Sequence, residues 1–185
     1  ASYTSIVHNN ILYIGTNQGL FAKSMNKLKN SYIKDEKFIR VDKTLGQVWS
    51  LNVFKNQLFC GHNFGSFIIN DYKSEIISNT PGGWDFKEVP WNTNYLIAGT
   101  YTGIVSFKTQ GNTLVKKADL LGNFKESSRF VSIDEGGNIW VSHPYHGVFK
   151  LAIQANKPVS ISRYSEKEGL SSSMDNQVFK INNQI

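Results

Sequence analysis

The stretch Asn10-Ile-Leu-Tyr-Ile-Gly-Thr-Asn-Gln-Gly-Leu-Phe21 recurs along the chain, and its recurrence decides the fold. Three further copies align with it without gaps, at residues 56–67, 94–105 and 138–149. Each copy reads as an Asn, a short apolar run, a Gly or its replacement, three variable residues, a second Gly and an apolar pair. A fixed period of about 43 residues is typical of a repeat architecture.

Four strand-like pieces accompany each copy of this pattern. One apolar piece, such as Val48–Phe54, precedes the copy, two pieces flank the variable triplet, and a fourth piece, such as Pro158–Tyr164, closes the repeat. The second Gly ends a hairpin loop and suits a positive φ. Four short strands within about 43 residues predict one blade of a β-propeller.

We therefore predict an all-β fold, namely a β-propeller segment of about four blades, each with four antiparallel strands. The segment, residues 1–185, would be part of a larger ring of seven or eight blades. Its repeat cores are 10–21, 56–67, 94–105 and 138–149, and a fifth repeat begins near 178–185 with the expected strand Gln177–Ile181. Open blade edges can pair with another chain, so a homodimer is also expected.

The composition argues against several classes of function. No apolar run approaches the roughly 18 residues of a membrane span, and Ala1–Ser5 lack the pattern of a signal peptide. The net charge of +6 comes from scattered lysines, so nucleic acid is not an expected partner. Cys60 lies in an apolar run and is expected to be a buried, inert thiol. Asp134-Glu135 is interpreted as turn chemistry, and without a phosphate-loop, zinc-spacing or nucleophile-elbow motif we expect no cofactor and no metal.

The stretch Ser132-Ile-Asp-Glu-Gly-Gly-Asn-Ile-Trp-Val-Ser142, followed by Gly147-Val-Phe149, resembles the two-component-regulator propeller repeat, which is abundant in large sensors of Bacteroidetes bacteria. Tyr13–Thr16 and Glu168–Ser173 match the same repeat. The resemblance covers essentially the whole chain. It departs in the second and third repeats, which lack the Asp before the turn, and at His143, which stands where Gly is usual.

This resemblance implies an extracytoplasmic, periplasmic segment of a membrane-anchored sensor in bacterial signal transduction. In that family a β-sandwich domain and a membrane helix commonly follow the propeller, with a histidine kinase or DNA-binding output. The remaining blades and the β-sandwich are therefore implied protein partners. Glycan fragments are an implied class of ligand, and the segment itself would bind its ligand without catalysing a reaction.

Propeller geometry indicates where such a ligand would bind. Loops that join the second and third strands of each blade share one face with the loops that link successive blades, and this face is a common ligand site. The candidate ligand-contacting residues on it are His62, Phe64, Trp84, Tyr101, Arg129, His143, Tyr145 and His146. Aromatic rings stack on the apolar faces of sugars, while His and Arg donate hydrogen bonds to hydroxyl groups. Arg129 could instead pair with Glu126.

Two other functions are compatible with the sequence. Some propellers are polysaccharide lyases that use His and Tyr as base and acid, so His143-Pro-Tyr-His146 allows a glycan-active enzyme. Tyr, Trp and Arg are also common anchors of protein interfaces, which allows a protein-interaction scaffold. A metal site at His143 and His146 is not expected, because an i, i+3 pair across a turn converges only by chance.

Overall fold

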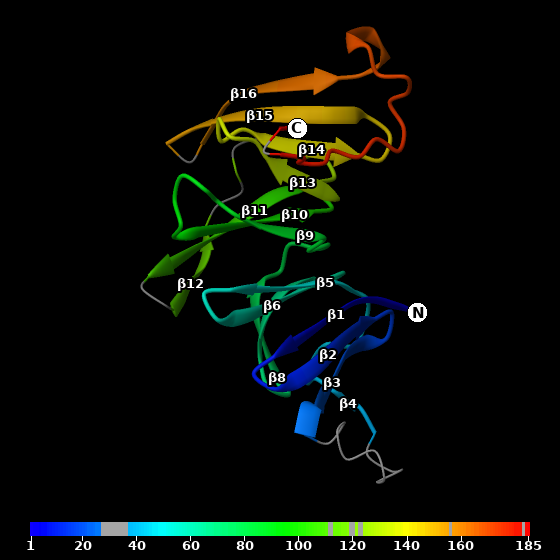
Figure 1. Cartoon of the computed structure of the whole chain (residues 1–185), viewed down its shortest axis with the longest axis vertical. Coiled ribbons are helices and arrows are strands. Elements are labelled where there is room, and N and C mark those ends of the chain that lie inside the picture. Colours follow the sequence, from blue (N-terminus) through cyan, green and yellow to red (C-terminus); the bar gives the residue numbers. More distant parts are fainter. Residues whose placement is uncertain (27–36, 111–112, 119–120, 122–123, 156, 183) are drawn as a thin grey trace. The chain divides into compact units, whose positions relative to one another are not determined.

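Within the described part of the chain, sixteen β-strands form the fold, and a short 3-10 helix, η1 (Glu166–Glu168), follows the last of them. The structure is a computed structural model that describes residues 1–26, 37–110, 113–118, 121, 124–155, 157–182 and 184–185. The strands form four sheets, and the chain divides into two units, Ala1–Gly83 and Trp84–Ile185 (Figure 1).

Each sheet is a four-stranded antiparallel meander in which successive strands are neighbours. Unit 1 contains β1 (Ser2–His8), β2 (Ile11–Thr16), β3 (Gly19–Ser24) and β4 (Ile39–Arg40), then β5 (Val48–Phe54), β6 (Gln57–His62), β7 (Gly65–Asn70) and β8 (Lys73–Ser78). Unit 2 contains β9 (Asp85–Glu88), β10 (Tyr95–Thr100), β11 (Gly103–Gln110) and β12 (Thr113–Ala118), then β13 (Phe130–Ile133), β14 (Ile139–His143), β15 (Gly147–Gln154) and β16 (Lys157–Tyr164). The predicted all-β fold of four four-stranded blades is confirmed, whereas the size of a closed ring stays a prediction.

The second Gly of each repeat begins the third strand of its sheet, with a positive φ in all four repeats. At Gly65 the φ is 153°, and an added Cβ would lie 2.1 Å from the Ser78 carbonyl oxygen. At Gly147 the φ is 80°, and an added Cβ would meet the Tyr164 carbonyl oxygen at 2.1 Å. Glycine is therefore required for close approach of the fourth strand as well as for the turn.

Strand pairing shows that the gap-free alignment is wrong at the fourth hairpin. The last residue of the second strand pairs with the second Gly in every repeat, in the pairs Thr16–Gly19, His62–Gly65, Thr100–Gly103 and His143–Gly147. The fourth loop therefore holds one more residue than the others. Ser142, and not His143, occupies the position of Gly15, Gly61 and Gly99.

A neighbouring segment explains the glycines at this position. A Cβ on Gly99 would lie 2.0 Å from the Ser128 carbonyl oxygen, so the linker before β13 leaves no room for a side chain. At the equivalent Ser142 the side chain is used instead, because its Oγ accepts a hydrogen bond from the Val178 N–H at 2.9 Å. The fourth repeat thus has a serine instead of a glycine at this position, because the adjoining segment leaves room for a side chain there.

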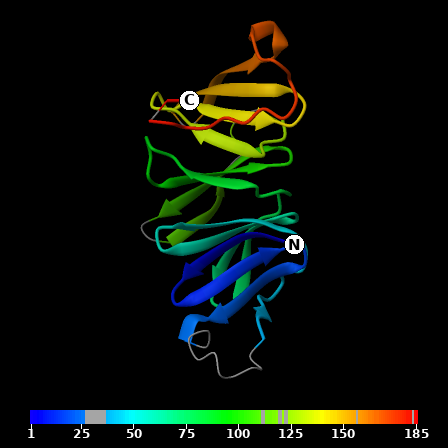
Figure 2. The ribbon, with the colours of Figure 1, turned by 45° about the vertical axis from the view of Figure 1, so that its right-hand side comes forward.

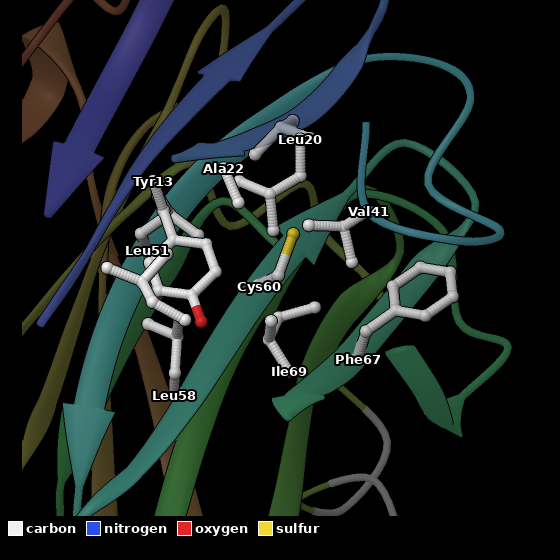
Figure 3. Close-up of a cluster of buried hydrophobic side chains, with 11 residues drawn as sticks. Tyr13, Leu20, Ala22, Val41, Leu51, Leu58, Cys60, Phe67 and Ile69 are labelled. Atoms are coloured by element: carbon white, nitrogen blue, oxygen red, sulfur yellow. The ribbon is translucent and has the colours of Figure 1, made fainter. Parts of the chain in front are cut away.

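Each unit has its own apolar core between its two sheets. In unit 1, Tyr13, Leu20 and Ala22 pack with residues of the second sheet, including Cys60 (Figure 3). In unit 2, the corresponding cluster contains Ile97, Ile104, Val131, Ile139, Val141 and Leu151 among others. Each fully buried Leu or Ile contributes roughly 1.5–3 kcal/mol. Cys60 is completely buried, and burial raises the pKa of its thiol, which confirms the inert, buried cysteine.

The Asp134 carboxylate organises the turn between β13 and β14, as its interpretation as turn chemistry requires. Its oxygens accept hydrogen bonds from the Asn138 backbone N–H at 2.8 Å, the Asn138 side-chain amide at 2.8 and 3.1 Å, and Trp140 Nε1 at 2.8 Å. Burial raises the pKa of Asp134, but these bonds from Trp140 and Asn138 outweigh that effect and hold its pKa below the usual value.

The segment after η1 lies against the sheet β13–β16 without joining it. The Val178 carbonyl accepts from Ser132 Oγ at 3.3 Å, and Figure 2 shows the red C-terminal segment beside this sheet. The expected strand Gln177–Ile181 is not formed; the pairing that the structure describes there is a single bridge between Ile181 and Gln184. The fifth repeat near 178–185, of which residue 183 lies outside the described residues, stays a prediction.

Candidate functional site

The last residue of each second strand holds the loop that follows it. Thr16 and Thr100 use Oγ1 to accept the backbone N–H two residues later, at 3.0 and 3.3 Å. His62 does the same with Nδ1, which accepts the Phe64 N–H at 3.1 Å. His143 Nδ1 accepts two backbone N–H groups, of Tyr145 and His146, both at 3.0 Å. The two histidines therefore share one structural role that the sequence alignment did not reveal.

Two of the eight candidate residues, His62 and Phe64, lie in unit 1. His62 is 0% exposed and packs against the rings of Phe64 and Phe67, and its burial lowers its pKa. Its ring caps the loop from inside the fold, and the expected contact of His62 with a ligand stays a prediction. Phe64, 62% exposed, remains available for contact.

Three side chains of unit 2 meet at the linker before β13 and the hairpin after β14. The rings of His143 and His146 stack with centroids 4.1 Å apart and planes 3° from parallel. Glu126 Oε2 lies 3.4 Å from His143 Nε2 and 3.1 Å from His146 Nδ1. Arg163 Nε donates to the His146 carbonyl at 2.8 Å, which fixes the end of the hairpin. The two histidines converge because the longer loop folds back over His143, and Glu126 is a partner that sequence reasoning missed.

The hydrogen bonds assign the proton of His143 to one ring nitrogen. Two backbone N–H groups point at Nδ1, so Nδ1 is an acceptor and Nε2 carries the proton, 3.4 Å from Glu126 Oε2. His143 is only 8% exposed. Burial lowers its pKa, and the nearby His146 and Arg163 lower it further against the opposing effect of Glu126. His143 is therefore a neutral structural group at pH 7.

This tautomer makes the cluster a poor metal site despite its composition. Ligand atoms of Glu126, His143 and His146 lie within 4.8 Å of one another. Metal binding through His143 Nε2 would move the ring proton to Nδ1, where it would face two backbone N–H donors. The nearly parallel rings also direct their lone pairs side by side rather than toward one ion. We interpret the cluster as a hydrogen-bonded unit that orients His146.

A second group of unit 2 combines Trp84, Tyr101 and Arg129. The rings of Trp84 and Tyr101 pack edge to face, with centroids 5.3 Å apart. The guanidinium carbon of Arg129 lies 4.9 Å from the Trp84 ring centroid and 5.4 Å from that of Phe130. These distances are those of cation–π contacts. The expected alternative, pairing of Arg129 with Glu126, is not observed, because Glu126 engages the two histidines.

Two hollows lie near these residues in unit 2. A recess of about 60 Å³ is lined by Arg129, Phe130, Ser142, His143, Pro144 and Asn176, among others. It connects the Arg129 group to the histidine cluster, beside which Tyr145 is 65% exposed. A larger groove of about 500 Å³, which sequence reasoning missed, is lined by residues of β9, β13 and the segment Val178–Lys180.

Comparisons with known proteins identify the fold and no closer relationship. No family model and no curated protein matches the sequence. Among solved structures, the chain is similar to the extracellular domain of BT4673 from B. thetaiotaomicron, which is described as a hybrid two-component system. The TM-score is 0.67 and the identity 14%, and the match covers 98% of this chain and 25% of that one. The extracellular domain of BT3049 from the same organism, described in the same terms, gives a TM-score of 0.55 and 15% identity over 88% of this chain and 27% of that one.

An enzyme also resembles the chain. An ancestral GH74 enzyme has a TM-score of 0.54 and 15% identity over 89% of this chain and 24% of its own. The chain thus spans about a quarter of the length of each of these proteins. Identities this low establish a common fold and leave the function to be argued from the site.

No helix among the described residues is both long and apolar enough to cross a membrane.

Proposed function

We propose that the chain is a ligand-recognising β-propeller segment of an extracytoplasmic sensor in bacterial signal transduction, and that it binds glycan fragments without catalysis. The observation that carries the proposal is the group of Trp84, Tyr101 and Arg129 beside the recess that leads to His143. The likeness to extracellular domains of two Bacteroides sensor systems supports it at the level of the fold.

The chemistry of this surface suits a sugar. A pyranose has apolar C–H faces that stack on aromatic rings, and its hydroxyl groups need donors and acceptors in fixed positions. Trp84 and Tyr101 offer rings inclined at 67° to each other, and Arg129 and His146 supply polar groups. Tyr145, on the hairpin beside the recess, extends the aromatic area.

Ligand binding here would reach the rest of a larger protein through the linker before β13. That linker carries Glu126 and Arg129 and joins the sheet β9–β12 to the sheet β13–β16. A ligand that contacts it favours one arrangement of the adjoining elements, by no more than its difference in affinity for the two arrangements. The remaining blades and a β-sandwich domain of the parent protein are the proposed recipients of that change.

One observation favours an enzyme as a second candidate. His146 Nδ1 lies 3.1 Å from Glu126 Oε2, and the His146 side chain is 49% exposed. A carboxylate that holds one ring nitrogen leaves the other as a base facing solvent, which is the arrangement of a general base. Tyr145 could then serve as the acid in a glycan-active site.

Binding and cleavage can be separated with one set of variants. We would titrate a panel of neutral and acidic oligosaccharides by calorimetry and analyse each sugar by chromatography afterwards. Tyr101→Ala should lower the affinity of the bound sugar about tenfold, through loss of ring stacking. Tyr3→Ala, which removes an exposed ring in unit 1 outside the candidate residues, serves as the matched control. Cleavage that is lost in His146→Ala would establish the enzyme and refute the proposal.

A further inference from the structure

Arg129 presents a positive charge that no carboxylate among the described residues neutralises. Its side chain is exposed, and its contacts among the described residues are the two ring contacts with Trp84 and Phe130. Glu126, three positions earlier, is the nearest carboxylate in sequence, but its Oε2 is held by His143 and His146. No ion pair to Arg129 is found in the described part of unit 2.

The two ring contacts leave the N–H groups of the guanidinium without a hydrogen bond to the described residues. Contact with an aromatic ring occupies the face of the planar group and leaves its N–H edge available. That edge carries donors in a fork that matches the two oxygens of a carboxylate or sulfate. Because Trp84 and Phe130 already hold the side chain, less conformational entropy is lost when an anion binds.

The adjoining recess has the size of one charged substituent. Its volume of about 60 Å³ is several times the roughly 10–15 Å³ that one water needs by this measure, so the recess admits a small group such as a carboxylate or a sulfate. Ser142 and Asn176 line it beside Arg129 and provide polar groups. Asp175 is the acidic residue of this wall, and its exposure to water screens its charge.

We infer that Arg129 receives an anionic oxygen group of the ligand, so that the sugar recognised by this surface is acidic, bearing a carboxylate or a sulfate. This inference rests on the proposed function and specifies its ligand class. The sugar ring stacks on Trp84 and Tyr101, and its anionic substituent enters the recess beside Arg129.

The test compares charged and neutral sugars of the same length. Tetragalacturonate, a sulfated tetrasaccharide and maltotetraose would be titrated into the whole chain, with saturation followed by NMR. One of the charged sugars should bind at least about tenfold more tightly than maltotetraose, and the two charged probes separate a carboxylate from a sulfate source. The affinity of the chain for the charged sugar should fall as the salt concentration rises.

Variants of Arg129 test whether the preference for a charged sugar comes from the paired N–H donors of the guanidinium. Arg129→Gln should remove the preference for the charged sugar, and Arg129→Lys should weaken binding about tenfold although it keeps the charge. Lys125→Gln removes an exposed cation from the same linker and should change affinity less than about twofold. The unfolding midpoint of each variant distinguishes lost binding from lost structure.

Equal binding of neutral and charged sugars, or full affinity in Arg129→Gln, would overturn the inference and leave the proposed function standing. Failure of every charged probe to bind at millimolar concentration would also overturn it. Cleavage of a probe would instead contradict the proposed function itself.

Discussion

His143 offers the sharpest test of the architecture around the candidate site. Its Nδ1 accepts the Tyr145 and His146 N–H groups, while its Nε2 faces Glu126. Asparagine places its side-chain oxygen close to the position of Nδ1 but has nothing at the position of Nε2. His143→Asn therefore keeps the loop cap and loses the contact with Glu126, whereas His143→Ala loses both.

The magnitudes follow from the bonds that each substitution removes. Each hydrogen bond contributes about 0.5–1.5 kcal/mol. His143→Asn, which loses the 3.4 Å contact of Nε2 with the Glu126 carboxylate, should cost about 1 kcal/mol or less. His143→Ala also leaves two backbone N–H groups without an acceptor and removes a nearly buried ring, so it should cost about 2–4 kcal/mol.

Urea unfolding of unit 2, followed through its tryptophans, gives the free energies. Amide hydrogen exchange of Tyr145 and His146 gives the local readout. Exchange should accelerate in His143→Ala and stay close to wild type in His143→Asn. If both variants lose stability equally and both amides exchange fast in each, Nδ1 is not the acceptor and the assigned tautomer is wrong.

Three further outcomes are expected. Gly99→Ser should destabilise unit 2 by about 3 kcal/mol or more, since a Cβ would lie 2.0 Å from a backbone oxygen. Ser142→Gly at the equivalent position should cost only about 1 kcal/mol, as measured by urea unfolding. Equal effects of the two substitutions would refute the revised alignment. Asp134→Asn should cost about 1–3 kcal/mol at pH 7. The stability that the wild type gains from the lowered pKa of Asp134 should be present above the unfolded pKa of about 3.9 and should be lost as the pH falls through the folded pKa. An Asp134→Asn variant whose stability falls with acid just as that of the wild type does would contradict this. Zinc should leave the ring signals of His143 and His146 unshifted in NMR spectra, and saturable binding of one equivalent would overturn the metal argument.

The repeat made the fold predictable because its signals are local. The second Gly at the head of each third strand and Asp134 at a turn act within a few residues of their own positions, and the structure contains both as expected. The register of the fourth hairpin was mispredicted because one additional loop residue leaves the apolar pattern intact. Strand pairing through Gly147 is what reveals that residue.

The site was less predictable because its contacts join distant segments. Glu126 is 20 residues from His146, and no periodic pattern links a linker carboxylate to a hairpin histidine. The inward orientation of His62 was not predicted for a related reason, since a histidine at the end of a strand can point inward to cap the loop that follows. Arg129 was identified, but its partners proved to be aromatic rings rather than Glu126.

We propose that unit 2 binds a sugar at Trp84, Tyr101 and Arg129 without changing it. An NMR titration with the oligosaccharide selected from the panel, followed by chromatography of the recovered sugar, tests both parts. We expect saturable shifts of the Trp84 indole and the Arg129 side-chain signals, with the sugar recovered intact. Shifts confined to the groove along β9 and β13, or a shortened sugar, would contradict it.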